Sequence, residues 1–252
     1  MADIDEAHLW SYLREFEGGA FEEATVVSYP TTDVLERDLL LATSDGQETV
    51  PTVAGLLLFG GDERVSELLP RAAVTVTRFS GDSPQSAIIE RVRLSGNLLS
   101  VYEGLTRFIQ RYCDLTEVRP KNARAVEEES PVPARSSYHR GVVAEAITNM
   151  LAHRDLALRD LPSRIHVFDH SLEFVNSRRS VGFSPVAQKA IRYGMPERLN
   201  PRLAAVLTSS AYGLKLSLQG LPSLLREAKR FSGRKAEIVS FNDEFRLRIY
   251  GS

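Results

Sequence analysis

The chain has 252 residues, with 31 Lys and Arg against 33 Asp and Glu, so its formal net charge is only −2. This balance gives no bulk electrostatic reason to bind nucleic acid. Cys113 is the single cysteine, which excludes a disulfide framework and a cysteine metal cluster. The N-terminus is acidic where a secretory signal is basic and then apolar, and no apolar run reaches membrane-spanning length. We therefore expect a cytoplasmic protein with no membrane partner.

Residues 1–48 are expected to form an N-terminal helical segment. Apolar periodicity predicts a helix over 6–16 and a second periodic stretch over 34–42. Gly18-Gly19 and a Tyr-Pro turn signal separate the two. This part of the chain carries no motif that indicates a function.

Residues 49–115 are expected to form a small α/β domain. The pattern predicts a helix over 53–59, strands over 72–79 and 88–94, and a long helix over 98–112. The last helix has a continuous apolar stripe, which favours a core face over a ligand site.

Residues 116–137 are rich in Arg, Glu, Pro and Ser, which predicts a linker. Its acidic run at 127–129 is interpreted as a solvated turn. The remaining 138–252 form the C-terminal domain. Its expected elements are a helix over 145–155, a hairpin over 165–175, helices over 185–193, 201–209 and 221–231, and strands over 236–241 and 245–249. Helices on one face of an antiparallel or mixed sheet give an α+β two-layer sandwich.

Three polar side chains recur every four residues within the otherwise apolar helix at 145–155. Glu145, Asn149 and His153 would share one face of that helix. A carboxylate can orient or deprotonate water, and an amide oxygen can help to hold a hydrated divalent cation beside a phosphate. The solvated face of an ordinary amphipathic helix has the same pattern, so spacing alone leaves both interpretations open.

This helix, followed by Arg164–Asn176, resembles the C-terminal ATP-binding domain of RecG-like and Schlafen-type bacterial regulators. That domain is similar to the GHKL ATPase superfamily of gyrase, Hsp90, MutL and histidine kinases. The resemblance extends to segments 51–60, 78–81, 96–99 and 200–204. It implies the two-layer α/β sandwich of the GHKL (Bergerat) fold, preceded by a smaller α/β domain.

The resemblance also implies a nucleotide site that holds ATP and magnesium. Glu145 takes the place of the water-orienting catalytic base, and Asn149 that of the magnesium-binding amide. The other implied nucleotide-binding residues are His153, Asn176 and Gly220. Tyr138 precedes the helix, where it is either a pocket-edge residue or a packing staple.

Two loops depart from the family pattern. An Asn-Pro-Gly turn in the family is Asn176-Ser177-Arg178 here, and a loop with two glycines keeps only Gly220, with Leu218 in place of the other. A phosphate cradle depends on backbone N–H groups that converge beside a helix N-terminus. A side chain at either position can obstruct that convergence.

Two hypotheses follow. The chain is a magnesium-ATP-binding module of a DNA-associated or transcriptional regulator, with weak ATP hydrolysis and a dimeric state. Alternatively, it is a degenerate, nucleotide-free scaffold or dimerisation module in a defence- or DNA-related assembly. DNA binding would come through a partner or a missing N-terminal domain, because the basic run at 226–235 is better interpreted as a solvated helix face. The chain has no P-loop sequence, so a P-loop motor is excluded.

Overall fold

The computed structural model describes residues 2–16, 31–44, 48–119, 135–156, 162–177, 200–214, 216–218, 220–241 and 244–252. The helical elements are α1 Glu6–Phe16, α3 Thr31–Asp33, η1 Val34–Asp38, α4 Val53–Phe59, α5 Asp62–Leu68, η2 Pro70–Ala72, α6 Leu98–Tyr112, α7 Arg140–Ala152, α9 Pro201–Leu207, η3 Ser210–Tyr212 and α10 Gly220–Ser232. The strands are β1 Ala42–Ser44, β2 Thr49–Pro51, β3 Val74–Phe79, β4 Ile88–Leu94, β5 Asp114–Thr116, β6 Ser137–His139, β7 Arg164–Val167, β8 Ser171–Ser177, β9 Glu237–Phe241 and β10 Glu244–Tyr250. The expected helix at 185–193, the acidic run at 127–129 and Arg178 lie outside the described residues.

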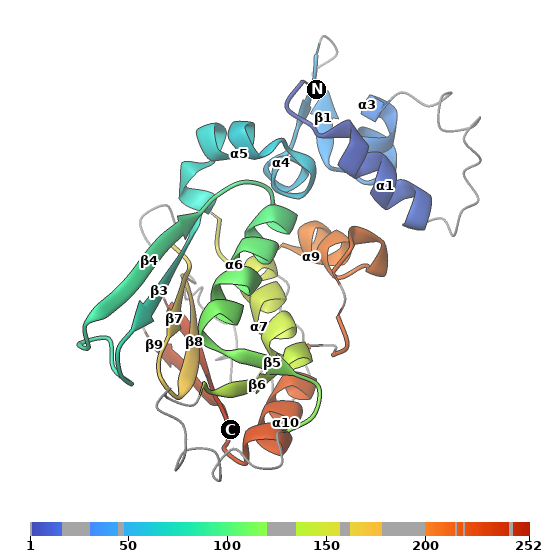
Figure 1. Cartoon of the computed structure of the whole chain (residues 1–252). Coiled ribbons are helices and arrows are strands. Elements are labelled where there is room, and N and C mark those ends of the chain that lie inside the picture. The colour runs from blue at the N-terminus through green and yellow to red at the C-terminus, as the bar shows by residue number, and fades with distance from the viewer. Residues whose placement is uncertain are drawn as a thin grey trace.

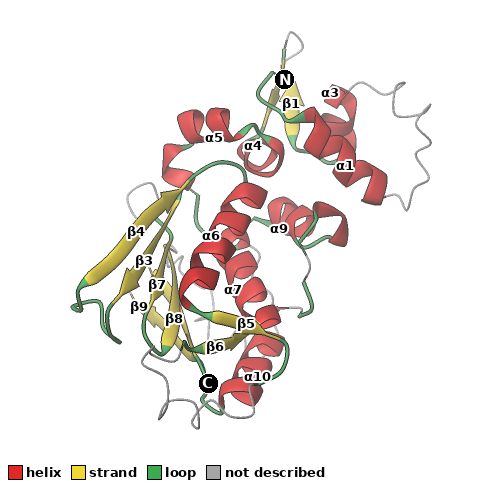
Figure 2. Cartoon of the chain, in the orientation of Figure 1, coloured by secondary structure: helices red, strands yellow, loops and turns green. Residues whose placement is uncertain are grey.

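A six-stranded mixed sheet forms one layer, with strand order β4-β3-β7-β8-β10-β9. Strands β3 and β7 are parallel, and the other neighbours are antiparallel. Helices α6, α7 and α10 cover one face of this sheet (Figures 1 and 2). The chain therefore has the expected mixed α+β architecture with helices layered on a sheet.

The sheet also connects two parts of the chain that the sequence suggests as separate units. Strand β3 belongs to residues 49–115, and its partner β7 belongs to residues 138–252. Val76 of β3 lies opposite Ile165 of β7, and both side chains are fully buried in the same core. Because the two units share a sheet and a core, neither closes a hydrophobic core alone.

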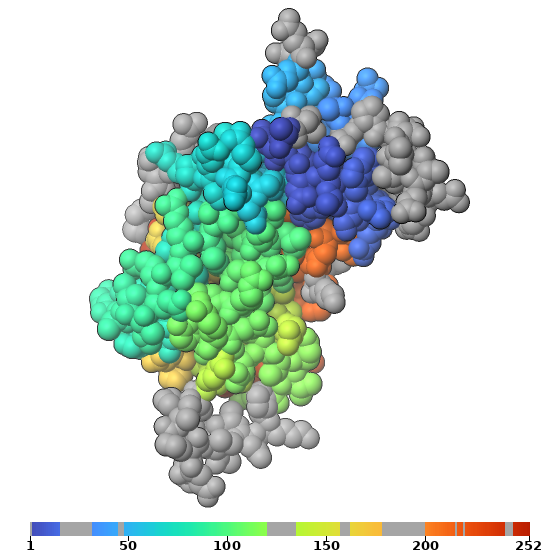
Figure 3. Space-filling model, turned by 45° about the horizontal axis from the view of Figure 1, so that its top comes forward, coloured from blue at the N-terminus to red at the C-terminus, as the bar shows by residue number. Residues whose placement is uncertain are grey.

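The N-terminal segment packs on α4 and η3 through aromatic side chains. The rings of Tyr12, Phe59 and Tyr212 lie within 6.4 Å of one another, centroid to centroid. The Tyr212 hydroxyl donates to the carbonyl of Leu58 at 2.7 Å. Figure 3 shows these N-terminal residues, in blue, gathered at one end of the molecule.

Capping residues set the starts of two predicted helices. Thr52 accepts a hydrogen bond from the N–H of Gly55 at 3.1 Å, and Asn97 accepts one from the N–H of Ser100 at 3.0 Å. The expected bounds of α4 and α6 are confirmed, as are those of α1 and β4. Side-chain caps satisfy orphan N–H groups and so define where a helix begins.

Other expected bounds are corrected. Strand β3 begins at Val74, because residues 70–72 form a 3₁₀ turn. The periodic stretch at 34–42 divides into the π-helical turn η1 and the start of β1. Among the described residues, no helix is both long enough and apolar enough to cross a lipid bilayer.

Candidate functional site

Glu145 and Asn149 lie one turn apart on α7 and contact each other. The Glu145 side chain is buried, with 5% of the residue exposed. Its Oε1 atom accepts hydrogen bonds from Asn149 Nδ2 at 2.7 Å and from the backbone N–H of Gly220 at 2.7 Å. Asn149 Nδ2 also donates to the Glu145 carbonyl at 2.8 Å. The fold thus brings three of the predicted site residues to one point.

Gly220 begins α10, a helix of 13 residues. Its φ of +75° lies in the left-handed region, which favours glycine. The Gly220 N–H therefore stands at a helix N-terminus, where negative charge is favoured by the helix dipole and by the unpaired N–H groups. In this structure the Glu145 carboxylate takes that place.

Burial raises the pKa of the Glu145 carboxyl above its ordinary value. The hydrogen bonds from Gly220 and Asn149 act in the opposite direction, because they stabilise the charged form. Desolvation outweighs them. The carboxylate is held in an environment that makes it a stronger proton acceptor than an exposed glutamate.

Helix α7 ends at Ala152 and does not reach residue 155 as predicted. His153 follows with φ −111° and ψ 30°, outside the helical region. The Asn200 side chain donates to the carbonyls of Ala152 and Arg154, at 3.0 and 2.8 Å. These bonds satisfy carbonyls at the helix end and turn the chain away. His153 is the C-cap residue of α7, and its N–H still donates to the Asn149 carbonyl at 3.0 Å.

Arg154 anchors the end of α7 to the turn before β3. It is 4% exposed, and its Nη1 donates to the carbonyl of Ala72 at 2.5 Å. Burial lowers its pKa to about 10. This contact gives Arg154 a structural role at the helix end.

Asn176 is buried on β8, and both ends of its amide are hydrogen-bonded. Its Nδ2 donates to the Met150 carbonyl at 2.8 Å, and its Oδ1 accepts from Ser163 Oγ at 2.7 Å. The side chain ties β8 to the residue after Asn149. Asn176 therefore contacts the backbone of α7 next to Asn149, but these hydrogen bonds do not connect it to Glu145 or Gly220.

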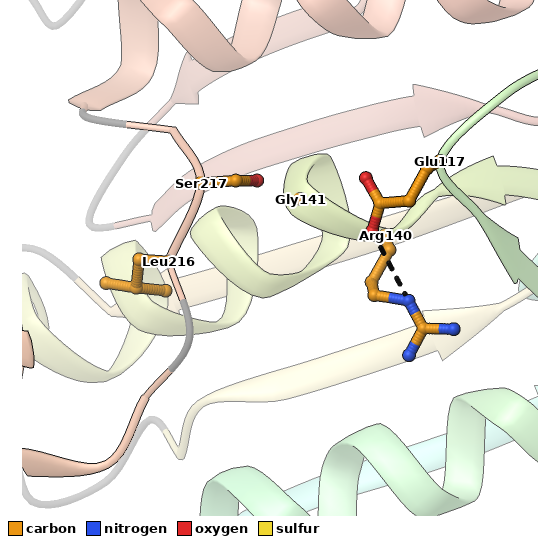
Figure 4. Close-up of a pocket in the computed structure, with 5 residues that line it drawn as sticks. All are labelled: Glu117, Arg140, Gly141, Leu216 and Ser217. Carbon is orange, nitrogen blue, oxygen red and sulfur yellow. Dashed lines mark ion pairs between the residues drawn. The ribbon is translucent and has the colours of Figure 1, made fainter.

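A cavity of about 340 Å³ lies one helical turn before Glu145. Its lining comes from three segments: Glu117 after β5, Arg140 and Gly141 at the start of α7, and Leu216 and Ser217 before α10 (Figure 4). None of these five residues was predicted as a site residue from the sequence. The one sequence feature that could have indicated this pocket is the position of Gly141, four residues before Glu145 and therefore on the same helix face.

Tyr138 and the basic residues of α10 were two further candidates, and the structure places both in structural surroundings. Tyr138 is 1% exposed within β6, which fits a packing residue and not a pocket edge. Arg226, Lys229 and Arg230 are exposed on α10, and Arg230 pairs with Glu227 on the same helix at 2.9 Å. These basic residues form a solvated helix face.

Comparisons with known proteins identify a fold. No protein-family model matches the chain, and no curated protein matches it. The crystal structure of the DIP2311 protein from Corynebacterium diphtheriae is similar, with a TM-score of 0.60 and 15% sequence identity. The similarity covers 100% of this chain and 45% of that protein, so this chain spans less than half the length of its structural neighbour. At this identity the match shows a shared fold alone.

Proposed function

We propose that this chain binds a magnesium nucleotide of the ATP type at Glu145, Asn149 and Gly220. One observation carries the proposal: a single carboxylate oxygen, Glu145 Oε1, receives hydrogen bonds from both Asn149 and the Gly220 N–H. A carboxylate, an amide and a helix N-terminus thus converge, as the resemblance to the GHKL ATPases requires of these positions.

The residues present fit magnesium and phosphate. Magnesium keeps most of its ligands as water and phosphate oxygens, so one or two protein oxygens suffice. The Asn149 Oδ1 atom takes no part in the two bonds that its Nδ2 donates, and it is the candidate oxygen ligand.

Gly220 and Glu145 have complementary roles in this proposal. The Gly220 N–H and the start of α10 offer a positive end for phosphate oxygens. Magnesium, when bound, would neutralise phosphate charge beside Asn149. Glu145 would leave the Gly220 N–H when phosphate arrives, and its carboxylate would then be free to take a proton from a water molecule. Weak hydrolysis is the activity that this arrangement supports.

A specific observation favours the second candidate, a nucleotide-free scaffold or dimerisation module. Glu145 already occupies the N–H of Gly220, and Leu218 packs against the core beside that loop. The hydrogen-bonding groups of the site are therefore already occupied by contacts within the protein. Under this alternative the hydrogen bonds serve only to hold α10 on α7.

Asn149→Ala distinguishes the two candidates. We expect this variant to bind a fluorescent magnesium-ATP analogue at least about tenfold more weakly, because a metal ligand is lost. The matched control is Gln110→Ala on the exposed side of α6, which should leave the affinity unchanged. Equal affinity in wild type and Asn149→Ala would contradict the proposed site. Self-association that survives in Asn149→Ala, without nucleotide binding by the wild type, would support the scaffold.

A further inference from the structure

Helix α1 docks on the rest of the fold through one apolar face. Leu9, Tyr12 and Leu13 recur at helical spacing, and all three side chains are buried in the core. The helix packs against α4 and η3, at the end of the molecule that carries the N-terminus (Figure 1). His8 lies one turn before Tyr12, so its imidazole belongs to the same docked face.

The His8 imidazole is enclosed by aromatic rings from two other elements. Its centroid lies 5.2 Å from that of Phe59 in α4 and 5.1 Å from that of Tyr212 in η3. Its Nε2 atom is buried and has no hydrogen-bond partner in the part of the chain that the structure describes. In the neutral ring one nitrogen carries no hydrogen, and Nε2 can be that atom. In the cation both nitrogens carry hydrogen, so Nε2 would hold a buried N–H group without an acceptor.

Two carboxylates face the ring, but both are already engaged. Asp5 precedes the helix and Asp62 begins α5, and each attracts a positive charge on His8. Asp5 Oδ1 accepts a hydrogen bond from the backbone N–H of His8 at 3.0 Å. Asp62 Oδ1 accepts one from the backbone N–H of Asn97 at 2.9 Å. Neither of these bonds reaches the buried Nε2 atom.

Burial therefore decides which form of the ring the docked helix prefers. It is the largest influence on the pKa of His8 and lowers that pKa below the ordinary value of 6.5, against the attraction of the two carboxylates. The Tyr12 and Tyr212 hydroxyls are the other titratable groups near the ring. Burial raises the pKa of both, so they add no charge near neutral pH.

We propose that protonation of His8 releases α1 from α4 and η3, which makes the docking of this helix a pH-sensitive switch. Above pH 6.5 the ring is mostly neutral in the docked and the undocked helix, and docking has its full strength. As pH falls below 6.5, the undocked helix takes up the proton first, because its ring is in water. Docking weakens until the docked ring is protonated as well. Release would uncover the rings of Phe59 and Tyr212, and it involves none of the residues of the proposed nucleotide site.

His8→Phe tests the switch, because phenylalanine keeps a ring between Phe59 and Tyr212 and cannot be protonated. Hydrogen exchange of the whole chain, corrected for the intrinsic exchange rate, measures the protection of the N–H groups in residues 6–16. We expect protection in wild type to fall at least about threefold between pH 7 and pH 5, and in His8→Phe to change less than about 1.5-fold. His170→Gln is the matched control: this imidazole is exposed over 70% of its side chain, so the variant should respond like wild type.

A titration of the His8 ring by NMR in the wild-type chain is the second readout, and it does not depend on whether the variant folds. The switch requires the ring to titrate below its ordinary pKa of 6.5. A ring that titrates at or above this value would overturn the inference. An equal loss of α1 protection in wild type and His8→Phe would overturn it as well, because the loss would then come from another group.

Discussion

The Glu145 carboxylate illustrates how one residue can serve both the fold and a site. It is buried on α7, yet its two donors, Asn149 and Gly220, come from the helix and from a loop 75 residues away. Burial and hydrogen bonding act on its pKa in opposite directions, and burial prevails. The hydrogen bonds from Asn149 and Gly220 thus offset only part of the free-energy cost of burying the charge.

Stability should therefore depend on pH through Glu145. Burial raises the pKa of Glu145 in the folded state above the ordinary glutamate value of 4.5, so the folded state binds the proton more tightly than the unfolded state. The resulting stabilisation is complete below about pH 4.5 and is lost as pH rises through the folded pKa. Glu145→Gln keeps an oxygen acceptor for both donors and removes the charge. We expect it to melt a few degrees higher than wild type at pH 7.

The difference in melting temperature should shrink toward zero as pH falls to 4, and calorimetric melting across this range measures it. Glu103→Gln is the control, because Glu103 is exposed in a surface ion pair with Arg107 and should change little at either pH. A Glu145→Gln variant that melts lower than wild type at pH 7 and equally at pH 4 would contradict a destabilising buried charge.

At the scale of elements, the clearest sequence signals were caps and apolar periodicity. Thr52 and Asn97 both accept hydrogen bonds from N–H groups at the starts of predicted helices, and the bounds of those helices were predicted correctly. The short pairs β1–β2 and β5–β6 were missed, because three-residue strands are too short to show a period of two. The end of α7 was also missed, since it depends on Asn200, which is distant in sequence.

The same limit applies to the candidate site. Local spacing predicted that Glu145 and Asn149 share a helix face, and they do. The position of Gly220 beside them came from family resemblance. Arg140 and Ser217 line the same pocket only because the segment before α10 folds back on α7, which no local pattern encodes.

Gly55 lies where the backbone of α4 closely approaches that of residue 41, so a substitution there tests how tightly these two segments pack. A Cβ atom at Gly55 would lie 2.2 Å from the Leu41 carbonyl oxygen, which Thr52 also contacts. We expect Gly55→Ala to destabilise the protein by about 1–3 kcal/mol, because backbone atoms must move apart. Gly61→Ala is the matched control, since its Cβ would meet nothing within 4 Å. Chemical denaturation measures both, and equal stability of the two variants would contradict the close packing of α4 on residue 41.

The whole molecule depends on the parallel pairing of β3 with β7, which joins residues 49–115 to residues 138–252. A fragment of residues 136–252 would expose the β7 edge and the face of α7 that packs on α6. We expect it to lack a cooperative melting transition, and to regain one when expressed together with residues 1–119. Circular dichroism on heating measures this. A cooperative transition of the isolated fragment would show that the C-terminal part folds independently.

In the proposed function, α7 and the start of α10 hold a magnesium nucleotide. The most direct measurement is a calorimetric titration of the whole chain with a non-hydrolysable ATP analogue, with magnesium and then with a chelator. We expect saturable binding that magnesium strengthens at least about tenfold, because Asn149 acts through the metal. No heat at millimolar nucleotide in either condition would contradict the claim and leave the scaffold as the remaining function.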